Sequence, residues 1–482
     1  MRVFIWVLIA LAFLVNLVGL KDGHNWGDDF AQYIISANNI MEGRPYASGI
    51  MLDKPEVLPP GLSLLLVPEL KVFGLNFKVL KLWNIFSWYL SIVFLYLLFL
   101  RIKGTRFALW SAVFLAVSSF FFVFKQNVLS DIPFFLCVCS SLYTLERWEN
   151  NTSILQGRLF FTGYLFSMVA ATWLRSAGVI LFVAALFYFI FIKRDKKASV
   201  AVLTVFIVNE FLLFCWMGWH PGNFADIWQM PRTVLNDLIH NFPTVFQSLW
   251  YFLCPAQTVF SRALFNMVDP LVCLAAPVLY LIVIWSFIRG LQKQSLSYLE
   301  CFSFIYLSLS IFWSWIFTPP ENFARYVLPL LPFVFWGFWR LLDFLKRFKL
   351  DFYALARVIF LVLLLINFTN IAINRNFNDD VFSLPENSEL VNWIKQNMKP
   401  GEHFMFWKPR ALALFTQREG TAPWISLGQE GYFIQRVKAF KISYVFSFKD
   451  DDYTGLTARL DKSEEFRLVW VNGAFKIFKF IN

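Results

Sequence analysis

Long apolar runs follow one another along most of the chain and end near residue 373. Several of them reach about 18 residues, which is enough for a helix to cross a hydrocarbon core of roughly 30 Å. The pattern predicts about eleven crossing helices, at 1–20, 79–100, 107–124, 131–146, 159–174, 177–192, 199–217, 270–288, 299–317, 325–342 and 354–372. The sequence therefore predicts a polytopic α-helical membrane domain over residues 1–373.

Two shorter apolar stretches lie in the first loop, 21–78. Phe30–Met41 has helical spacing, and Leu62–Phe73 is apolar but too short to cross a bilayer. Both are typical of helices that lie along the membrane interface.

Beyond residue 373 the composition changes to that of a soluble domain. The pattern there predicts one amphipathic helix and four strands, at 388–398, 404–407, 442–448, 466–471 and 474–480. We therefore expect a small α/β domain over residues 374–482.

Basic residues gather in every second loop between the predicted spans. Cytoplasmic loops carry an excess of Lys and Arg, so these loops are expected in the cytoplasm. They contain Arg101, Lys103, Arg106, Arg147, Arg158, Lys193, Arg194, Lys196, Lys197, Arg289, Lys293, Arg340, Lys346, Arg347 and Lys349. The loops 21–78 and 218–269 and the C-terminal domain then lie outside, as in a protein of a bacterial inner membrane.

The composition narrows the class of protein further. With 58% hydrophobic, 20% aromatic and only 16% charged residues, the chain exceeds the apolar content of soluble globular proteins. Its net charge of +11 is explained by the basic loops, so nucleic acid is not an expected partner. The six cysteines form no C-x-x-C pair and nearly all fall in or beside apolar runs, which argues against a disulfide framework or a zinc site.

An adjacent acidic pair, Asp28 and Asp29, opens the first interfacial stretch. The helix dipole favours carboxylates at this end, and Asp28 suits a helix cap. A cap uses one carboxylate, whereas a general base with a neighbour that orients the acceptor or a cation would use both. The pattern leaves cap and catalyst equally open.

Three ionisable residues stand at the outer ends of predicted spans: Asp131, Arg175 and Arg325. Ionisable groups at membrane depth are costly and usually face a cavity or a partner. Asp131 also suits a helix start, and Arg325 suits an arginine that reaches the lipid headgroups. The functional alternative is that the planar guanidinium groups bind a phosphate.

Lys54 in the first loop is another candidate phosphate contact. A divalent metal ion is a weaker hypothesis, because the four histidines are scattered. Its candidate ligands are Asp53, Glu56 and His220, with His24 and Asp28 as alternatives. The sequence indicates no other cofactor.

These motifs share an order along the chain and one expected side of the membrane. Together they resemble the GT-C class of membrane glycosyltransferases, in the branch that contains protein O-mannosyltransferases and the aminoarabinose transferase of lipid A. The matching segments are Gly27–Tyr33, Gly43–Tyr46, Asp53–Pro55, Pro59–Gly61, Leu129–Pro133, Leu174–Arg175 and Arg325–Pro329. The C-terminal domain is similar to the extracytoplasmic domain of some members.

The resemblance implies a sugar donor carried on a polyprenyl phosphate and an inverting transfer on the outer face of the membrane. It implies that Asp28 or Asp29 is the base, that Asp131 assists, and that Lys54 and Arg325 hold the lipid phosphate. Further residues of these motifs and spans are assigned to substrate binding: Tyr33, Arg44, Tyr46, Arg175 and Tyr326. Membrane lipids are expected neighbours.

The chain departs from the family pattern in the first loop. The segment from Asp53 to Glu56 is a looser form of the acidic-Lys-Pro-Pro pattern, with the double proline displaced to Pro59–Pro60. Protein-mannosylating members usually carry Asp-Glu in place of Asp28-Asp29 and insert a sugar-binding domain that this sequence does not show. A glycan or lipid acceptor is therefore expected in preference to a protein.

Two other classes of function remain as alternatives. A transporter or flippase of lipid-linked glycans would have broken helices and charges near the bilayer midplane, often with internal repeats. Here the charges stand at span ends on one side, which favours the enzyme. A membrane scaffold with a receptor-like tail would give the acidic pair, Asp131 and Arg325 no shared purpose.

Overall fold

The structure is a computed structural model that describes residues 2–27, 29–49, 51–52, 57–217, 234–255, 259–312, 320–347, 353–374, 380–423, 430–449 and 455–481. The chain divides into two compact units. The membrane unit comprises Met1–Leu20, Leu82–Lys125 and Ser130–Phe377. The loop–sheet unit comprises Lys21–Lys81, Gln126–Leu129 and Asn378–Asn482.

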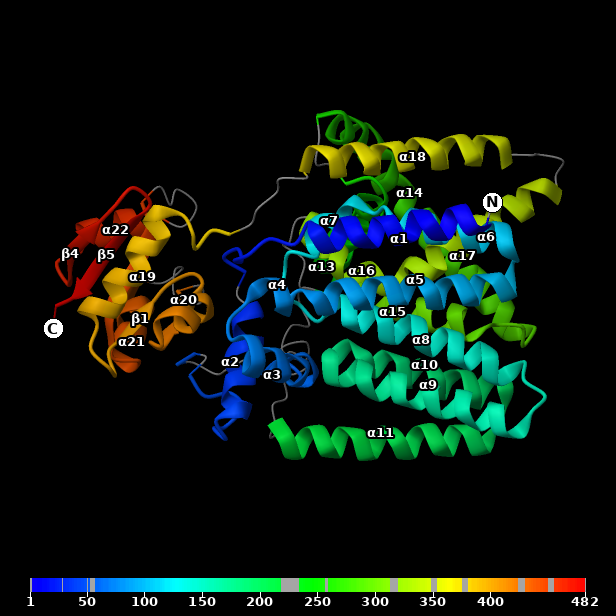
Figure 1. Ribbon diagram of the computed structural model, residues 1–482, viewed down its shortest axis with the longest axis horizontal. Helices are drawn as coiled ribbons and strands as arrows, with labels where there is room; N and C mark the ends of the chain where they lie inside the picture. The colour runs from blue at the N-terminus through cyan, green and yellow to red at the C-terminus, as the bar shows by residue number, and fades with distance from the viewer. Residues whose placement is uncertain are drawn as a thin grey trace. The chain divides into compact units, whose positions relative to one another are not determined.

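The membrane unit is built of apolar helices, many of which run alongside one another in Figure 1. Helix α5 packs against α6, and α8 packs against α9, because each pair is joined by a short connection. Helix α5 also packs against α8, which is more distant in the chain. Its described elements are α1 (Arg2–Val18), α5 (Leu82–Ile102), α6 (Thr105–Ala116), α7 (Ser119–Phe124), α8 (Asp131–Glu149), α9 (Ile154–Leu174), η1 (Ser176–Gly178), α10 (Val179–Phe187), η2 (Tyr188–Lys193), α11 (Lys196–Met217), α13 (Val234–Leu253), α14 (Val259–Gln292), α15 (Tyr298–Phe312), α16 (Pro320–Val327), η3 (Leu328–Leu330), α17 (Leu331–Arg347) and α18 (Tyr353–Ile373).

Six helical stretches in the described part of the chain are long and apolar enough to cross a membrane. They are Phe77–Ile102, Thr105–Phe124, Ile154–Leu174, Ser176–Lys193, Lys196–Met217 and Tyr353–Ile373, and each coincides with a predicted segment. Other predicted segments coincide with shorter or more polar helices such as α1, α8 and α15. The polytopic helical membrane fold is confirmed, and the total of about eleven spans stays a prediction.

Helix α14 bends by 51° between Arg262–Leu274 and Leu279–Gln292. It contains Pro270 and Pro277, and proline removes a backbone donor and clashes with the preceding turn. Counted as one span, this bent pair is the seventh candidate among the described residues.

The described C-terminal residues form a five-stranded mixed sheet with the order β2-β1-β3-β5-β4. Strands β1, β2 and β3 run parallel, and β5 runs antiparallel to both β3 and β4. The elements are α19 (Pro385–Asn397), β1 (His403–Met405), α20 (Pro409–Thr416), β2 (Gly420–Thr421), α21 (Glu430–Ala439), β3 (Ile442–Phe448), α22 (Leu456–Lys462), β4 (Phe466–Val471) and β5 (Phe475–Phe480). The predicted α/β domain is confirmed, whereas β2, α20, α21 and α22 were not predicted.

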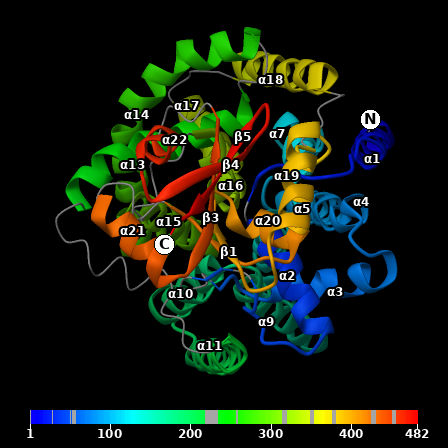
Figure 2. The same cartoon turned by 90° about the vertical axis from the view of Figure 1, so that its left-hand side faces the viewer.

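Alternation along the strands gives this sheet a core on each face. Phe404 and Phe446 pack with α19, whereas Met405 and Val445 pack with α21 and α22. Figure 2 shows α19 and α21 on opposite sides of the sheet. The fold is therefore a three-layer α/β/α arrangement.

The first loop belongs to the same unit as the sheet. Its helices are α2 (Asp29–Met41), α3 (Gly61–Phe73) and α4 (Phe77–Leu80), so both predicted interfacial stretches are helical. Trp26 packs against Phe382, Phe406 and Phe475, with ring centroids 4.7–6.1 Å apart. The Leu52 N–H donates to the Gly420 carbonyl at 3.1 Å. Residues of the first loop therefore complete the core of the C-terminal domain.

Candidate active site

An ion pair between Asp131 and Arg175 lies in the membrane unit. Asp131 is the first residue of α8, and Arg175 directly follows the last residue of α9. Because α8 and α9 are antiparallel neighbours, the start of one lies beside the end of the other. The Asp131 side chain is only 2% exposed, so the guanidinium group of Arg175 is needed to compensate its buried carboxylate.

Tyr326 lies between this ion pair and a second arginine. The Arg175 guanidinium carbon is 5.0 Å from the centre of the Tyr326 ring, and that of Arg325 is 4.7 Å from it. Arg325 Nη2 also donates to the Tyr326 hydroxyl at 2.7 Å. The formal charges of Arg175, Arg325 and Asp131 sum to a net positive value, which suits an anion with several oxygens.

Tyr306 holds this arrangement from α15. Its hydroxyl donates to the Tyr326 carbonyl at 2.7 Å, at the end of α16. We name Asp131, Arg175, Arg325 and Tyr326 the arginine cluster. Four helical segments supply and support it, so its geometry depends on the packing of the whole membrane unit.

A second ion pair lies in the loop–sheet unit and involves the acidic pair of the first loop. Asp29 is the first residue of α2, and its carboxylate lies 3.4 Å from Arg410 Nη1. The Arg410 side chain is 8% exposed and that of Asp29 is 36% exposed. The C-terminal domain therefore contributes a cation to the loop that carries the predicted base.

His24 precedes this pair and is part of the core of the same unit. Its ring is 1% exposed and stacks on Phe30 with centroids 3.7 Å apart. Nε2 accepts the Val128 N–H at 3.0 Å, and Nδ1 lies 3.3 Å from the Asn25 carbonyl. Burial, aided by the nearby Lys81 cation, lowers the pKa of His24 to about 3, so the ring is neutral. Both ring nitrogens are engaged within the fold, which is unsuitable for a metal ligand.

Comparison with known proteins shows which fold this chain shares. The family model of dolichyl-phosphate-mannose-protein mannosyltransferases matches residues 57–219. The structure of ArnT from Cupriavidus metallidurans bound to undecaprenyl phosphate is 13% identical, with a TM-score of 0.58 over 98% of this chain and 97% of ArnT. The Archaeoglobus fulgidus oligosaccharyltransferase in complex with Zn and sulfate is 14% identical, with a TM-score of 0.60 over 95% of this chain and 70% of that protein. No curated protein matches the chain in sequence.

The chain has the GT-C fold of membrane glycosyltransferases. The resemblance that the sequence motifs indicated is thereby confirmed. The ArnT match extends over both units of this GT-C chain, because it covers nearly all of each protein.

Three other predicted substrate-binding residues of the GT-C chain lie in the first loop. Tyr33 is 4% exposed within α2. The Tyr46 hydroxyl donates to the Leu58 carbonyl at 3.0 Å and lies 3.2 Å from Ser63 Oγ, and burial raises its pKa to about 12. Arg44 is exposed and pairs with its near neighbour, the Glu42 carboxylate, at 2.6 Å. Tyr33 and Tyr46 are therefore committed to packing in this structure, and a role in substrate binding stays a prediction for all three.

Several predicted residues lie outside the part of the chain that the structure describes: Asp28, Asp53, Lys54, Glu56 and His220. Their assignments stay predictions. Within the described residues, no group of three or more His, Cys, Asp or Glu side chains could hold a metal ion. The divalent ion expected from the sequence therefore also stays a prediction.

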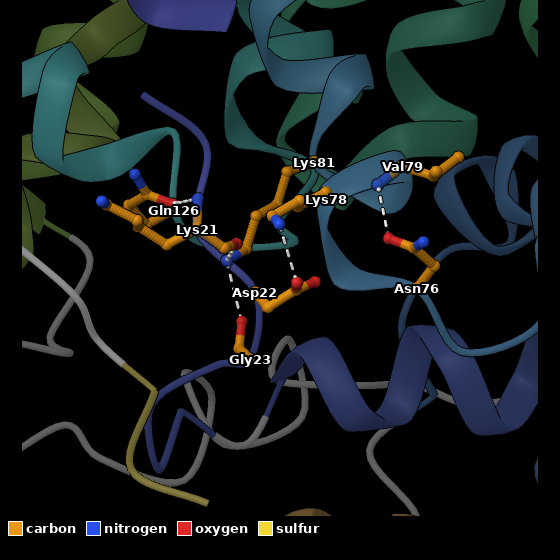
Figure 3. A network of polar contacts seen from close by, with 8 residues as sticks. All are labelled: Lys21, Asp22, Gly23, Asn76, Lys78, Val79, Lys81 and Gln126. Carbon is orange, nitrogen blue, oxygen red and sulfur yellow. Dashed lines mark hydrogen bonds and ion pairs between the residues drawn. The ribbon is translucent and has the colours of Figure 1, made fainter. Parts of the chain in front are cut away.

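Sequence reasoning did not predict a role for Lys81, which anchors the start of the first loop in Figure 3. Its ammonium group is almost fully buried and donates to the carbonyls of Lys21 and Gly23, each at 2.8 Å. The Lys21 N–H donates to Gln126 Oε1 at 3.1 Å in the same network. A lysine at the start of an apolar run was the available signal, because a buried ammonium group needs partners. Sequence reasoning assigned no role to Arg410 either.

Proposed function

We propose that the protein is an inverting glycosyltransferase that moves a sugar from a polyprenyl-phosphate donor to an acceptor on the outer face of the membrane. The observation that carries this proposal is the arginine cluster, in which Arg175 and Arg325 converge on Tyr326 beside the buried Asp131. Guanidinium groups are the side chains best suited to a phosphate, because their planar donors match its oxygens.

The lipid carrier of the donor is the second part of the proposal. ArnT, whose fold this chain shares, has been seen with undecaprenyl phosphate bound. A long isoprenoid chain is compatible with a protein whose helices expose apolar side chains to a bilayer. We infer that the arginine cluster binds the phosphate that joins such a lipid to the sugar. The family resemblance offers Lys54 as a further candidate for phosphate binding.

The proposed reaction is a displacement at the anomeric carbon. A carboxylate of the first loop, Asp28 or Asp29, takes the proton from an acceptor hydroxyl. The acceptor oxygen then bonds to the anomeric carbon while the bond from that carbon to the phosphate oxygen breaks. The polyprenyl phosphate leaves with the electron pair, and cations stabilise the charge that develops on it. Asp131 holds Arg175 in the orientation that this stabilisation needs.

The acceptor is proposed to be a glycan or a lipid rather than a protein. The first loop lacks the Asp-Glu pair of protein-mannosylating relatives and has Asp28-Asp29 in its place. We further infer that the enzyme lies in a bacterial inner membrane with its C-terminal domain outside. The alternating basic loops support this orientation.

A transporter of lipid-linked glycans is the other candidate function. Transporters commonly contain broken helices, and the bend of α14 is the described feature that would fit this function. Pro277 accounts for the bend without a transport role. The Asp131–Arg175 ion pair, where α8 begins and α9 ends, favours the enzyme.

The test is transfer by the purified protein in detergent or lipid nanodiscs. A panel of radiolabelled polyprenyl-phosphate sugars is supplied with extracted envelope lipids and glycans as acceptors. We expect one donor to lose its label to an acceptor, and Arg325→Lys to reduce this transfer while Arg357→Lys, at an exposed position of α18, does not. Consumption of no donor, or movement of intact donors across the bilayer without cleavage, would reject the proposal.

A further inference from the structure

We propose that Arg410 of the C-terminal domain is a positioning residue for the acidic pair of the first loop. This inference rests on the proposed glycosyl transfer and deepens it. It assigns to the C-terminal domain a direct part in holding the catalytic loop, and it gives Asp29 and Asp28 different tasks.

The contact itself is the first observation. Arg410 Nη1 lies 3.4 Å from Asp29 Oδ1, and Arg410 Nε lies 3.3 Å from the Met51 sulfur. Both partners belong to the first loop, more than 350 residues before Arg410 in the chain. Arg410 is only 6% exposed, and a guanidinium group that leaves water must be compensated by partners. The first loop supplies part of that compensation.

The packing around Asp29 and Arg410 restrains both side chains. Helices α2 and α20 pack together, and Asp29 and Arg410 both stand in the first turn of their helix. Pro409 begins α20 and presets its first backbone angle, which restrains the base of the arginine side chain. Two further contacts hold the first loop to the same domain. The Val381 N–H donates to the His24 carbonyl at 3.2 Å, and the Leu52 N–H donates to the Gly420 carbonyl at 3.1 Å.

The contact with Arg410 changes what the Asp29 carboxylate can do chemically. A carboxylate oxygen that accepts from a guanidinium group is less available to take a proton from an acceptor. Asp29 therefore orients the start of α2, and Asp28, the preceding residue of the chain, is left as the base. Because the two aspartates are joined by one peptide bond, an error in the position of Asp29 is passed to Asp28.

The kinetic test uses Arg410→Gln, Arg410→Lys, Asp29→Asn and the double variant Asp29→Asn/Arg410→Gln. Arg467→Gln, an exposed arginine on β4 of the same domain, is the matched control. We expect Arg410→Gln to lower kcat about tenfold to a hundredfold, as misplacement of a catalytic group does. The KM for the lipid donor should change little, and Arg410→Lys should recover part of kcat. The kcat of the double variant should be no lower than that of the less active single variant, because both substitutions break the same contact.

A second measurement separates this proposal from the proposed function. Amide hydrogen exchange across Asp29–Met41 should become faster in Arg410→Gln and stay unchanged in Arg467→Gln, while β3 and β5 keep their protection. If the wild type transfers no sugar but this exchange result is found, the glycosyltransferase proposal fails and the positioning of α2 by Arg410 stands. If α2 exchanges as in the wild type and kcat is retained in Arg410→Gln, the positioning proposal is overturned. Additive losses in the double variant would also overturn it.

Discussion

The Arg175 guanidinium group pairs with the Asp131 carboxylate where α9 ends and α8 begins. The two residues are 44 positions apart, and the packing of two antiparallel helices brings them together. A carboxylate exposed by only 2% depends on this cation, because an uncompensated charge in such a place is costly. The same contact orients Arg175 over Tyr326.

The first prediction concerns the stability of this pair. Asp131→Ala leaves Arg175 without its buried carboxylate partner and should lower the free energy of unfolding by about 3 kcal/mol. The measurement is thermal unfolding in detergent. Asp343→Ala is the control, because the Lys103–Asp343 ion pair is more exposed and should be worth less than about 1 kcal/mol. Equal losses of unfolding free energy in the two variants would show that the Asp131–Arg175 pair stabilises the protein no more than the exposed pair does.

The second prediction concerns the phosphate contact of Arg325. Arg325→Lys keeps the charge but loses the planar fork and its hydrogen bond to the Tyr326 hydroxyl. Affinity for the polyprenyl-phosphate donor should fall about tenfold or more, and Arg325→Ala should reduce it further. The measurement is donor binding to purified protein. Normal donor affinity in both variants would mean that Arg325 only anchors the helix at the headgroups.

The third prediction separates a helix cap from a catalytic base. Asparagine caps a helix about as well as aspartate but accepts no proton at neutral pH. Asp28→Asn and Asp29→Asn should each change the free energy of unfolding by less than about 1 kcal/mol. Asp28→Asn should abolish transfer, and Asp29→Asn should reduce it. Full activity in both variants would leave Asp131 as the next candidate base.

The fourth prediction follows from the neutral His24. Its pKa of about 3 lies below the ordinary value of 6.5, so the unfolded chain binds this proton more readily than the folded chain. The stabilisation from neutral His24 is therefore complete above pH 6.5 and is lost as the pH falls toward 3. Between pH 7.5 and pH 5 the loss should be about 2 kcal/mol.

This pH dependence is measured by the denaturant midpoint at the two pH values. His24→Gln lowers stability at both values but should remove most of the difference between them, because glutamine does not titrate. His403→Gln, the same substitution at the first residue of β1, is the control. An unchanged difference in His24→Gln would assign the pH dependence to other groups.

The fifth prediction concerns topology. If the basic loops face the cytoplasm, a reporter fused after Asn482 should behave as extracytoplasmic and one fused after Lys197 as cytoplasmic. The measurement is a pair of enzymatic reporters, each active on only one side. A cytoplasmic C-terminus would mean that the predicted number of spans is wrong by an odd number. It would also exclude a single outer site for the first loop and the C-terminal domain.

The sequence by itself determined most of the long apolar helices and four of the five described strands, whereas α13 lies in the segment 218–269 that was predicted as a loop. A crossing helix needs a run of apolar residues as long as the bilayer is thick, and this property is local to the run. Predicted segments such as 159–174 and 199–217 therefore coincide with α9 and α11 to within a few residues. The β-branched and aromatic residues of the segment 442–448 predicted β3 with its observed ends, Ile442–Phe448.

The tertiary structure alone decided which charges meet and which groups stay charged. Asp29 and Arg410 are 381 residues apart, and no local pattern relates them. The short strand β2 also escaped prediction, because its two residues pair with β1 only once the domain has folded. His24 looks like a titratable ligand in the sequence, yet burial against Phe30 makes it neutral. Contacts and burial arise from packing between distant segments, so the charge state and orientation of a side chain are properties of the folded chain.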